Sequence, residues 1–307
     1  MIDITQEEIM KNWGVDNSDN PLVTISCTAY NHEKYIAQAL DGFLMQKTNF
    51  PFEVIIHDDA SIDNTAAIIR EYEMKYPKII KPIYEKENQY SKGAGSLGQI
   101  MIPLYKGKYI AYCEGDDYWI NENKLQMQVD FIKNNPNYTM VCHNANVISS
   151  DGKFIKKFSN LETSDLSIED VISSWIIPTA SMLVQRNCVL NKPIIPNAPQ
   201  GDIIIHIECA DKGKIRYIQN VMSCYRWLTP NSATVSVRKN RLDYWKRHEM
   251  LWMELNKHYN YKYKDLIDKK ISYAEKRIKI ESIIQKFKFL QWGRSWYQQL
   301  RLLIKKI

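Results

Sequence analysis

The first half of the chain alternates strand-like and helical segments, a pattern that severely limits the folds open to it. β-branched and aromatic residues predict strands over residues 22–28, 52–57, 79–84, 109–113 and 139–149. Apolar residues at helical spacing predict helices over residues 32–45, 64–76, 99–105 and 124–134. Strands that alternate with helices in this way favour an α/β fold, in which helices cover both faces of a mainly parallel sheet.

Length and composition agree with a folded protein that has a large core. The 307 residues are 45% hydrophobic and allow one large domain with an appendage or two modest domains. The first 20 residues are polar, with acids where a signal peptide would have a basic start and an apolar run. No run approaches the roughly 18 consecutive apolar residues of a membrane span. The six cysteines are scattered without a C-x-x-C pair, so we expect reduced thiols and a cytoplasmic location.

Charge divides the chain into an acidic body and a basic C-terminal region. Residues 239–307 hold 18 Lys and Arg against 7 Asp and Glu, a net charge of +11, whereas the remainder carries −5. Beyond Arg241 the pattern predicts a helical extension. From Ser282 onward there are no acids, and a basic amphipathic helix with Trp292 and Trp296 suits an anionic membrane surface. The same helix could instead dock on the protein's own core or on a homodimer partner.

The residues that follow the predicted strands are the first indication of function. In a parallel α/β sheet, ligands bind outside the carboxyl ends of the strands. The first strand is followed by Thr-Ala-Tyr-Asn-His at residues 28–32, the second by Asp-Asp-Ala-Ser at 58–61, and the fourth by Glu-Gly-Asp-Asp at 114–117. Two of these three strand ends carry clustered acids. We therefore expect a polar, acidic ligand site at this edge of the sheet.

Clustered carboxylates repel one another unless a cation neutralises them. Glu114, Asp116 and Asp117 offer the hard oxygen ligands that Mg²⁺ or Mn²⁺ prefer, and such an ion would bridge a diphosphate. The alternative is a solvated acidic turn. Similarly, Asp59 could cap the next helix, and Tyr30 could either stack on a base or pack against the core.

Four stretches of the chain resemble a known family. They span roughly Pro21 to Trp227, and in order they are VTISCTAYNHEKYIAQALDGFLMQ, FEVIIHDDASIDNT, KGKYIAYCEGDDYWINENKLQMQVDFI and GDIIIHIECADKGKIRYIQNVMSCYRW. Together they are similar to the family 2 glycosyltransferases of GT-A fold, which build bacterial surface polysaccharides. The resemblance implies a Rossmann-like GT-A domain over residues 21–238, between an N-terminal lead of residues 1–20 and a basic helical region of residues 239–307.

The resemblance also implies a donor site. Thr28 and Tyr30 match positions that line a nucleoside pocket. Asp58 and Asp59 match an acid pair in which one carboxylate accepts a hydrogen bond from the imide of uracil. The expected ligand is therefore a nucleotide sugar, with UDP as the nucleotide.

The acidic turn matches the D-x-D region that holds the metal and the donor. Asp116 and Asp117 are the implied ligands of Mn²⁺ or Mg²⁺, whereas a longer Glu114 stands at the first position of the motif. Lys92 lies where the family often has an Arg-Asn helix start and could supply the phosphate contact instead. Arg226 matches a basic position near the donor phosphates.

Asp202 matches the acid that acts as the catalytic base. One base opposite the leaving group implies single displacement with inversion. Without the resemblance, Asp202 could simply cap a helix that begins at Ile203. The expected acceptor is a glycan or a lipid-linked saccharide, used at the inner face of the membrane in capsule, exopolysaccharide or lipopolysaccharide synthesis.

Other classes of function remain open from the residues alone. A nucleotidyltransferase would also use carboxylate-bound Mg²⁺, but it would favour a glycine-rich basic loop after the first strand, which residues 28–32 are not. A carbohydrate-binding protein on a decayed transferase fold would have lost acids that are present here. His143 could face an acceptor groove or pack in the core. No recognisable nucleic-acid-binding fold is present, so no nucleic acid partner is expected.

Overall fold

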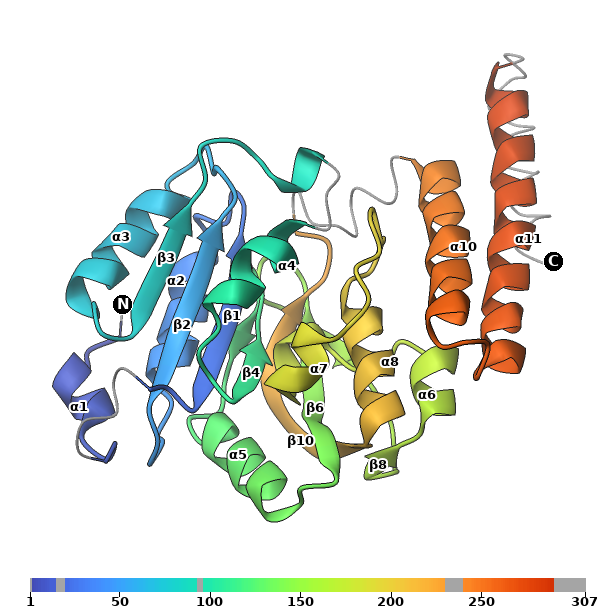
Figure 1. Cartoon of the computed structure of the whole chain (residues 1–307). Helices are drawn as coiled ribbons and strands as arrows, with labels where there is room; N and C mark the ends of the chain where they lie inside the picture. Colours follow the sequence, from blue (N-terminus) through green and yellow to red (C-terminus); the bar gives the residue numbers. More distant parts are fainter. Residues whose placement is uncertain (1, 15–19, 93–95, 230–239, 290–307) are drawn as a thin grey trace. The chain divides into compact units, whose positions relative to one another are not determined.

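The computed structural model describes residues 2–14, 20–92, 96–229 and 240–289 of the chain. They belong to two compact units. The larger unit comprises Met1–Pro196 and Gln200–Ser232, and the smaller comprises Asn197–Pro199 and Ala233–Ile307. All of the predicted site residues fall in the larger unit, which also contains the sheet (Figure 1).

The described residues of the larger unit form a ten-stranded sheet. Its main order is β3-β2-β1-β4-β9-β6-β10-β5, with β7 beside β6 and β8 beside β10. The strands are β1 (Val23–Ala29), β2 (Phe52–Asp58), β3 (Ile80–Tyr84), β4 (Tyr109–Tyr112), β5 (Tyr118–Trp119), β6 (Tyr138–Ile148), β7 (Phe154–Lys157), β8 (Asp165–Leu166), β9 (Leu183–Gln185) and β10 (Lys214–Arg226).

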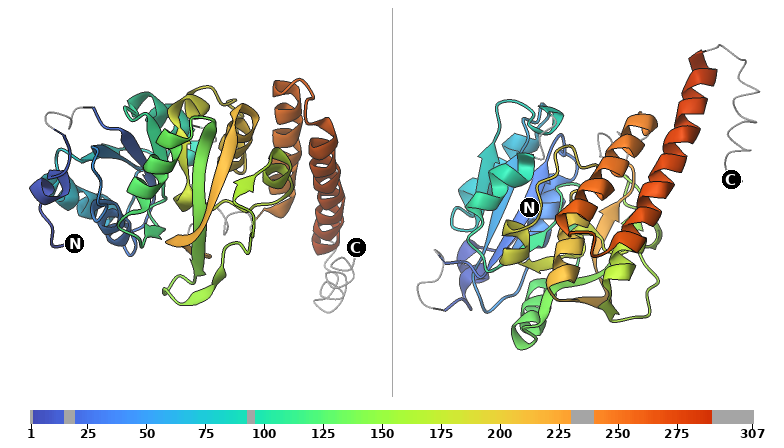
Figure 2. Two further views of the ribbon diagram at one scale, coloured as in Figure 1. Left: turned by 90° about the horizontal axis from the view of Figure 1, so that it is seen from below. Right: turned by 45° about the vertical axis from the view of Figure 1, so that its right-hand side comes forward.

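Most of the strand pairing is parallel, as predicted. β3, β2, β1 and β4 run parallel to one another, and β6 runs parallel to β10, which lies beside it in Figure 2. The short β9 joins these two parts because it pairs antiparallel with both β4 and β6. Every residue of β2 is buried, and so is every residue of β1 except the half-buried Thr28. Since neighbouring strand side chains point to opposite faces, both faces of these strands are covered.

The elements predicted in the first half of the chain are confirmed. The five predicted strands lie within one or two residues of β1, β2, β3, β4 and β6. The predicted helices correspond to α2 (Ile36–Leu44), α3 (Thr65–Lys75), α4 (Ser96–Met101, followed by a 3-10 turn) and α5 (Lys124–Asn134). Both α3 and α5 end one or two residues before a proline, whose ring would disturb a continuing helix.

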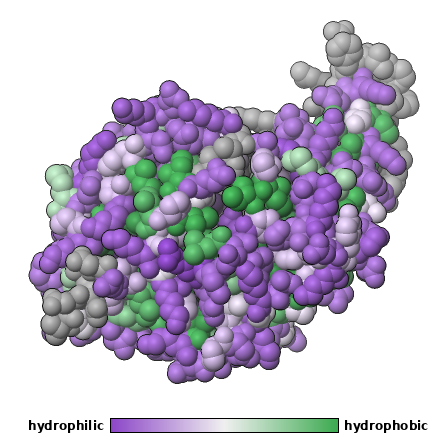
Figure 3. Space-filling model, in the orientation of Figure 1, coloured by the Kyte–Doolittle hydropathy of each residue, from purple (hydrophilic) through white to green (hydrophobic). Residues whose placement is uncertain are grey.

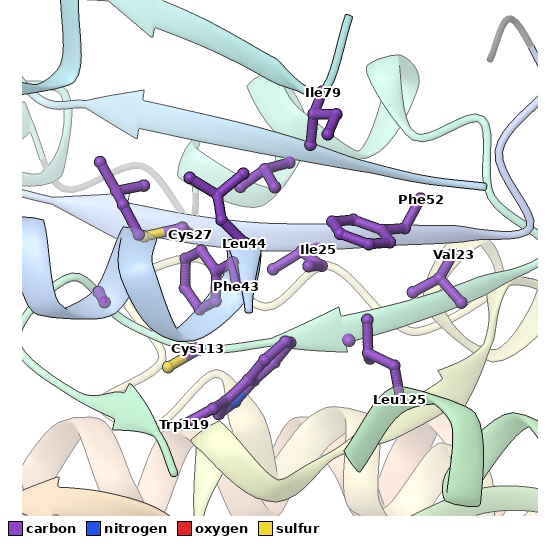
Figure 4. Close-up of a cluster of buried hydrophobic side chains, with 14 of the residues drawn as sticks. Val23, Ile25, Cys27, Phe43, Leu44, Phe52, Ile79, Cys113, Trp119 and Leu125 are labelled. Carbon is purple, nitrogen blue, oxygen red and sulfur yellow. The ribbon is translucent and has the colours of Figure 1, made fainter. Parts of the chain in front are cut away.

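The main core lies against β1, β2 and β4. Figure 4 shows Ile25, Phe43 and Trp119 among the buried side chains that fill it. The N-terminal lead joins the same core: it forms α1 (Gln6–Met10), and Trp13 packs edge-on against Phe52 at a ring-centroid distance of 5.2 Å.

The region after residue 149 contains structure that the sequence did not reveal. It includes β7 to β10, α6 (Ile168–Ser173), α7 (Arg186–Leu190) and α8 (Asp202–Lys212), whereas the Pro-rich loop predicted over residues 192–199 has no helix or strand. The start of α8 is a run of three isoleucines, which locally favours a strand. Residues 203–209 are all buried in the folded unit, so tertiary packing overrides that preference.

The smaller unit contains α10 (Arg241–His258) and α11 (Lys264–Phe289), which pack against each other. Glu281 of α11 forms ion pairs with Arg241 at 2.7 Å and with Arg277 at 3.2 Å. The predicted helical extension is therefore confirmed. The predicted basic helix begins within α11, but residues 290–307, with Trp292 and Trp296, lie outside the described part of the chain.

None of the helices in the described ranges has the length and apolar character needed to cross a membrane. The molecular face in Figure 3 is mainly hydrophilic, with scattered hydrophobic patches. All six cysteines are buried and free, in agreement with the expectation of reduced thiols.

Candidate functional site

Backbone hydrogen bonds bring the three predicted strand ends together. The N–H of Asp59, after β2, donates to the carbonyl of Ala29 at the end of β1, at 2.9 Å. The N–H of Gly115, after β4, donates to the carbonyl of Thr28 on β1, also at 2.9 Å. The central strand β1 thus carries an acidic turn on each side. The convergence inferred from sequence is present in the structure.

The two acids after β2 differ in their partners. The carboxylate of Asp59 accepts hydrogen bonds from the backbone N–H groups of Gln89, at 2.6 Å, and Tyr90, at 3.0 Å. Asp59 thus anchors the loop after β3. The N-cap position of α3 is Asn64, and the carboxylate nearest the start of this helix is that of Asp63, which accepts from the N–H of Thr65 at 3.0 Å. Capping of α3 is therefore not the role of Asp59.

Unlike Asp59, Asp58 has a carboxylate oxygen that is available to accept a hydrogen bond from a ligand. It is buried, and within the described residues its Oδ1 has no hydrogen-bond partner. Burial raises the pKa of Asp58, while hydrogen bonds from Ser61 act in the opposite direction. A buried carboxylate oxygen without a partner is costly unless a ligand supplies a donor. Of this acid pair, Asp58 is therefore the better candidate for binding a nucleobase N–H.

The acidic turn after β4 holds its carboxylates in three different environments. Asp117 is buried, and its Oδ1 accepts from the backbone N–H of Arg226 at 2.8 Å. Asp116 is also buried, and its Oδ2 accepts from the hydroxyl of Thr229 at 2.6 Å. The side chain of Glu114 is exposed. Gly115 is required because a Cβ at this position would lie 2.9 Å from Nδ1 of His32.

The turn lacks positive charge of its own. Burial and then the neighbouring acids Asp116 and Glu114 raise the pKa of Asp117 well above its usual range. Burial of its carboxyl, followed by the charges of Asp116 and Asp202, raises the pKa of Glu114 to about 8, although the residue as a whole is exposed. Asp202 is therefore near enough to the turn to interact with it electrostatically.

A divalent cation fits this turn only in part. Oδ2 of Asp117 is buried and has no partner among the described residues, as expected of a ligand atom that awaits a donor or a cation. In the described part of the chain, however, no three His, Cys, Asp or Glu side chains are grouped as a ready-made metal site. Mg²⁺ and Mn²⁺ sites in nucleotide enzymes often use one or two carboxylates and take their other ligands from phosphates and water. Asp116 and Asp117 would suit such a site.

Arg226 lies beside the acidic turn and has several protein partners. Its guanidinium hydrogen-bonds to Gln38 and lies over the rings of Tyr35, at 4.8 Å, and Tyr118, at 4.9 Å. Its charge lowers the pKa of Asp117, against the larger effect of burial. Arg226 therefore helps to hold the turn. These partners have no recognisable motif, and sequence analysis did not identify them.

Asp202 is the first residue of α8. Its Oδ2 accepts from Nε1 of Trp175 at 3.3 Å and from the hydroxyl of Thr179 at 3.4 Å, and its Oδ1 accepts from the N–H of Ile203 at 2.9 Å. Asp202 is therefore not the N-cap of α8, as the alternative interpretation had it: that position is Gly201, which makes no side-chain cap hydrogen bond. Asp202 also has two side-chain partners from a distant segment, which hold the carboxylate in one orientation. The sequence offered no signal for Trp175 or Thr179.

Of the remaining predicted residues, Tyr30 and Lys92 lie in loops that follow β1 and β3, whereas His143 lies within β6. Tyr30, directly after β1, is half-buried. Lys92 is exposed and pairs with Glu87 at 2.7 Å, in the loop that Asp59 anchors. His143 is fully buried and its Nδ1 hydrogen-bonds to the carbonyl of Asn144 at 2.8 Å, so it packs in the core and does not face an acceptor groove.

A buried lysine, Lys124, lies beside the ring of Trp119, which closely follows the acidic turn in sequence. Lys124 at the start of α5 is fully buried, with its Nζ donating to Gln128 at 2.8 Å and lying 3.9 Å from the centre of the Trp119 ring. Burial lowers its pKa to about 7, while Cys113 acts weakly in the opposite direction. The charge of Lys124 in turn helps to lower the pKa of buried His143. In the sequence, Lys124 was noted only as one residue of the third stretch that resembles the family.

Lys124 should make stability depend on pH. Between pH 7 and about 10.4 the unfolded lysine stays protonated while the folded one loses its proton, so stability rises with pH in this window. Relative to Lys124→Met, we expect the wild-type unfolding free energy to gain on the order of 2–4 kcal/mol from pH 7 to pH 10. Urea unfolding at several pH values measures this difference. The difference in unfolding free energy between wild type and Lys133→Met, a substitution at an exposed position of α5, should not change with pH. An equal pH trend of this difference for the two variants would contradict the prediction.

Comparison with known proteins adds a family to this geometry. A model described as "Glycosyl transferase family 2" matches residues 24–194. An uncharacterized protein of Mycobacterium tuberculosis is 37% identical over 205 residues, which are 66% of this chain and 58% of that protein. The chain therefore spans less than two thirds of the length of this relative. The Escherichia coli UDP-Glc:alpha-D-GlcNAc-diphosphoundecaprenol beta-1,3-glucosyltransferase WfgD is 33% identical over 143 residues, 45% of this chain and 52% of that protein.

Solved structures confirm the fold. Staphylococcus aureus TarS in complex with UDP-GlcNAc matches with a TM-score of 0.60 at 16% identity, covering 76% of this chain and 66% of that one. The mannosyltransferase PcManGT of Pyrobaculum calidifontis, in complex with GDP-Man and Mn²⁺, matches with a TM-score of 0.53 at 14% identity, covering 95% and 87%. At such identities the likeness establishes the fold alone, which is the expected GT-A fold.

Proposed function

Because this chain belongs to glycosyl transferase family 2, we propose that it transfers a sugar from a nucleotide-sugar donor to a saccharide or lipid-linked saccharide acceptor in bacterial surface polysaccharide synthesis. The observation that carries the proposal is the convergence of Asp58, the acidic turn and Asp202 at one edge of the sheet. The name of WfgD gives UDP-Glc as its donor and a diphosphoundecaprenol-linked sugar as its acceptor, and TarS was solved with UDP-GlcNAc. These relatives support UDP as the nucleotide.

The donor would lie across the ends of β1 and β2. The partnerless Oδ1 of Asp58 can accept the imide N–H of a uracil, and Tyr30 and Thr28 stand at the end of the neighbouring strand to contact the nucleoside. The diphosphate would extend toward Asp116 and Asp117. Lys92 and Arg226 are the cations proposed to offset its charge: Lys92 now pairs with Glu87, and the buried Nε of Arg226 has no partner among the described residues.

The proposed reaction is a single displacement with inversion. The acceptor hydroxyl oxygen attacks the anomeric carbon and forms the new C–O bond, while the bond from that carbon to the diphosphate oxygen breaks and its electron pair leaves with the nucleoside diphosphate. Asp202 accepts the hydroxyl proton, for which its Oδ1 has remaining lone-pair capacity. A divalent ion bound with Asp116 and Asp117 would supply Lewis-acid stabilisation of the leaving diphosphate.

The proposal is tested by donor binding and turnover. UDP-Glc, UDP-GlcNAc and GDP-Man should be compared by thermal shift with Mn²⁺ present and absent, because a ligand that binds the native state raises its apparent stability. The enzyme should also release the free nucleotide from its preferred donor when an acceptor mixture is added. If no nucleotide sugar shifts the melting temperature and none is consumed, the proposed function is wrong.

The basic C-terminal region is proposed to bring the enzyme to an anionic membrane surface, where lipid-linked acceptors reside. Its support is the net charge of +11 over residues 239–307. The full chain should sediment with vesicles that contain phosphatidylglycerol but not with purely zwitterionic vesicles, and removal of residues 290–307 should largely abolish this binding. Unchanged sedimentation of the shortened chain at low salt would contradict the proposal and favour docking on the protein itself or on a homodimer partner.

A further inference from the structure

Four aromatic side chains form a cluster beside Asp202. The aromatic cluster consists of Phe158, Trp175, Tyr225 and Trp227. Trp175 lies 5.1 Å from Phe158 and 5.9 Å from Tyr225 between ring centroids, and Tyr225 lies 6.2 Å from Trp227. All of these contacts are edge-on. None of the four residues belongs to the donor site described above.

The sheet topology assembles this cluster from distant parts of the sequence. Tyr225 is the next-to-last residue of β10, and Trp227 follows the strand with its N–H bonded to the carbonyl of Ile148, at the end of β6. Phe158 follows β7, and its N–H donates to the carbonyl of Ala145, also on β6. Strands β10 and β7 both pair with β6 and so bring Tyr225, Trp227 and Phe158 to one place, while Trp175 follows α6. All four residues belong to the larger unit.

The cluster is open to solvent where it could bind a ligand. Trp175 is 43% exposed and Trp227 is 36% exposed. Large aromatic side chains gain most from burial, so two exposed tryptophans in one cluster point to a surface that is covered in a complex. Tryptophan also combines an apolar ring face with a polar N–H, which suits ligands that have both characters.

Trp175 connects the cluster to the proposed base. Its Nε1–H donates to Oδ2 of Asp202 at 3.3 Å, so the edge of the indole ring touches the carboxylate that would take the acceptor proton. A ligand stacked on the exposed indole would therefore have its own edge beside Asp202. The proposed transfer reaction requires the acceptor hydroxyl at that edge.

We infer that the aromatic cluster is the acceptor subsite, and that it binds a pyranose ring by stacking the ring's apolar C–H face on Trp175. A pyranose fits because its axial C–H bonds form an apolar face, while its hydroxyls project from the ring edge toward Asp202. This inference rests on the proposed function, which it extends by naming the part of the enzyme that selects the acceptor sugar. Trp175 is also a positioning residue for Asp202 through its N–H.

The inference is tested with methyl β-D-glucopyranoside as the probe and saturating UDP present, so that the probe cannot enter the donor site. Saturation-transfer NMR on the wild type should show the strongest transfer to the axial ring protons. Trp175→Ala should weaken probe binding by about five- to ten-fold, while Trp175→Phe, which keeps a ring but loses the N–H, should weaken it by less. The UDP affinity of both variants, measured by calorimetry, should match that of the wild type and shows that they are folded.

Phe154→Ala is the matched control, since Phe154 is 61% exposed on β7 but is not part of the cluster. Its probe affinity should equal that of the wild type. Unchanged probe binding in Trp175→Ala, an equal loss in Phe154→Ala, or no probe binding by a wild type that binds UDP would each overturn the subsite and leave the proposed function standing. A wild type that binds no nucleotide would instead refute the proposed function.

Discussion

Replacement of Asp202 by asparagine should lower kcat by about 10²- to 10⁴-fold, the usual contribution of a positioned general base. The amide oxygen of asparagine can still accept hydrogen bonds from Trp175 and Thr179, while the bond from the N–H of Ile203 to Oδ1 is lost, so the helix start should change little. What the variant loses is the capacity to take the acceptor proton. The affinity for the nucleotide-sugar donor should stay within about two-fold of the wild type, because Asp202 is not among the proposed donor contacts.

The measurement is a transfer assay with separate donor titrations for wild type and variant. Asp130→Asn is a suitable control, since Asp130 is an exposed carboxylate on α5 that bonds only to Gln126 among its described partners. Its kcat should be unchanged. Full transfer by Asp202→Asn, with normal donor affinity, would remove Asp202 from the catalytic role and leave it as a residue that starts α8.

Removal of divalent metal with EDTA should lower turnover by about 10²-fold or more, because several kcal/mol of charge stabilisation at the leaving diphosphate would be lost. Added Mn²⁺ or Mg²⁺ should restore the rate. The described residues present no complete metal site, so the metal should bind weakly alone and more tightly once UDP supplies phosphate oxygens. By thermodynamic linkage, Mn²⁺ must then tighten UDP binding by the same factor, which calorimetry measures in both directions.

Asp117→Asn separates the metal role of the turn from its structural role. The amide oxygen can still accept the N–H of Arg226, while the partnerless Oδ2 and its negative charge are lost. The Mn²⁺ concentration at half-maximal rate should therefore rise by at least about ten-fold, because the ion loses one charge interaction. Undiminished turnover in EDTA, or an unchanged Mn²⁺ requirement in this variant, would show that the turn holds the donor without a metal.

Local sequence signals were sufficient for the first half of the fold. The strands β1, β2 and β4 are short β-branched or aromatic runs bounded by polar turns, and the helices α3 and α5 end just before prolines. Such signals act within a few residues, so a reader of the sequence can detect them. At α8 the local signals conflict: Asp202 offered a possible helix start, whereas the three isoleucines after it favour a strand, and the chain forms a helix that is buried in the folded unit. Short antiparallel strands such as β9 also escaped detection, since their pairing partners are distant in sequence.

The same division holds for the candidate site. Asp58, Asp116 and Asp117 could be named in advance because each directly follows a predicted strand, and parallel strands place such residues at one edge. Which of their carboxylate oxygens already have hydrogen-bond partners could not be named in advance. Asp59 is occupied by the loop after β3, whereas an oxygen of Asp58 is left without a described partner, and only the folded chain distinguishes the two.

The sequence by itself determined the alternating α/β architecture, the family, and the acids that collect at the ends of β1, β2 and β4, because periodicity and turn residues act locally. Only the tertiary structure decided which carboxylate oxygens are available and what lies beside Asp202. Trp175 and Asp202 are 27 residues apart and meet through a single hydrogen bond, while Phe158 and Tyr225 meet because β7 and β10 both pair with β6. Such contacts depend on strand order and register, which no short stretch of sequence encodes.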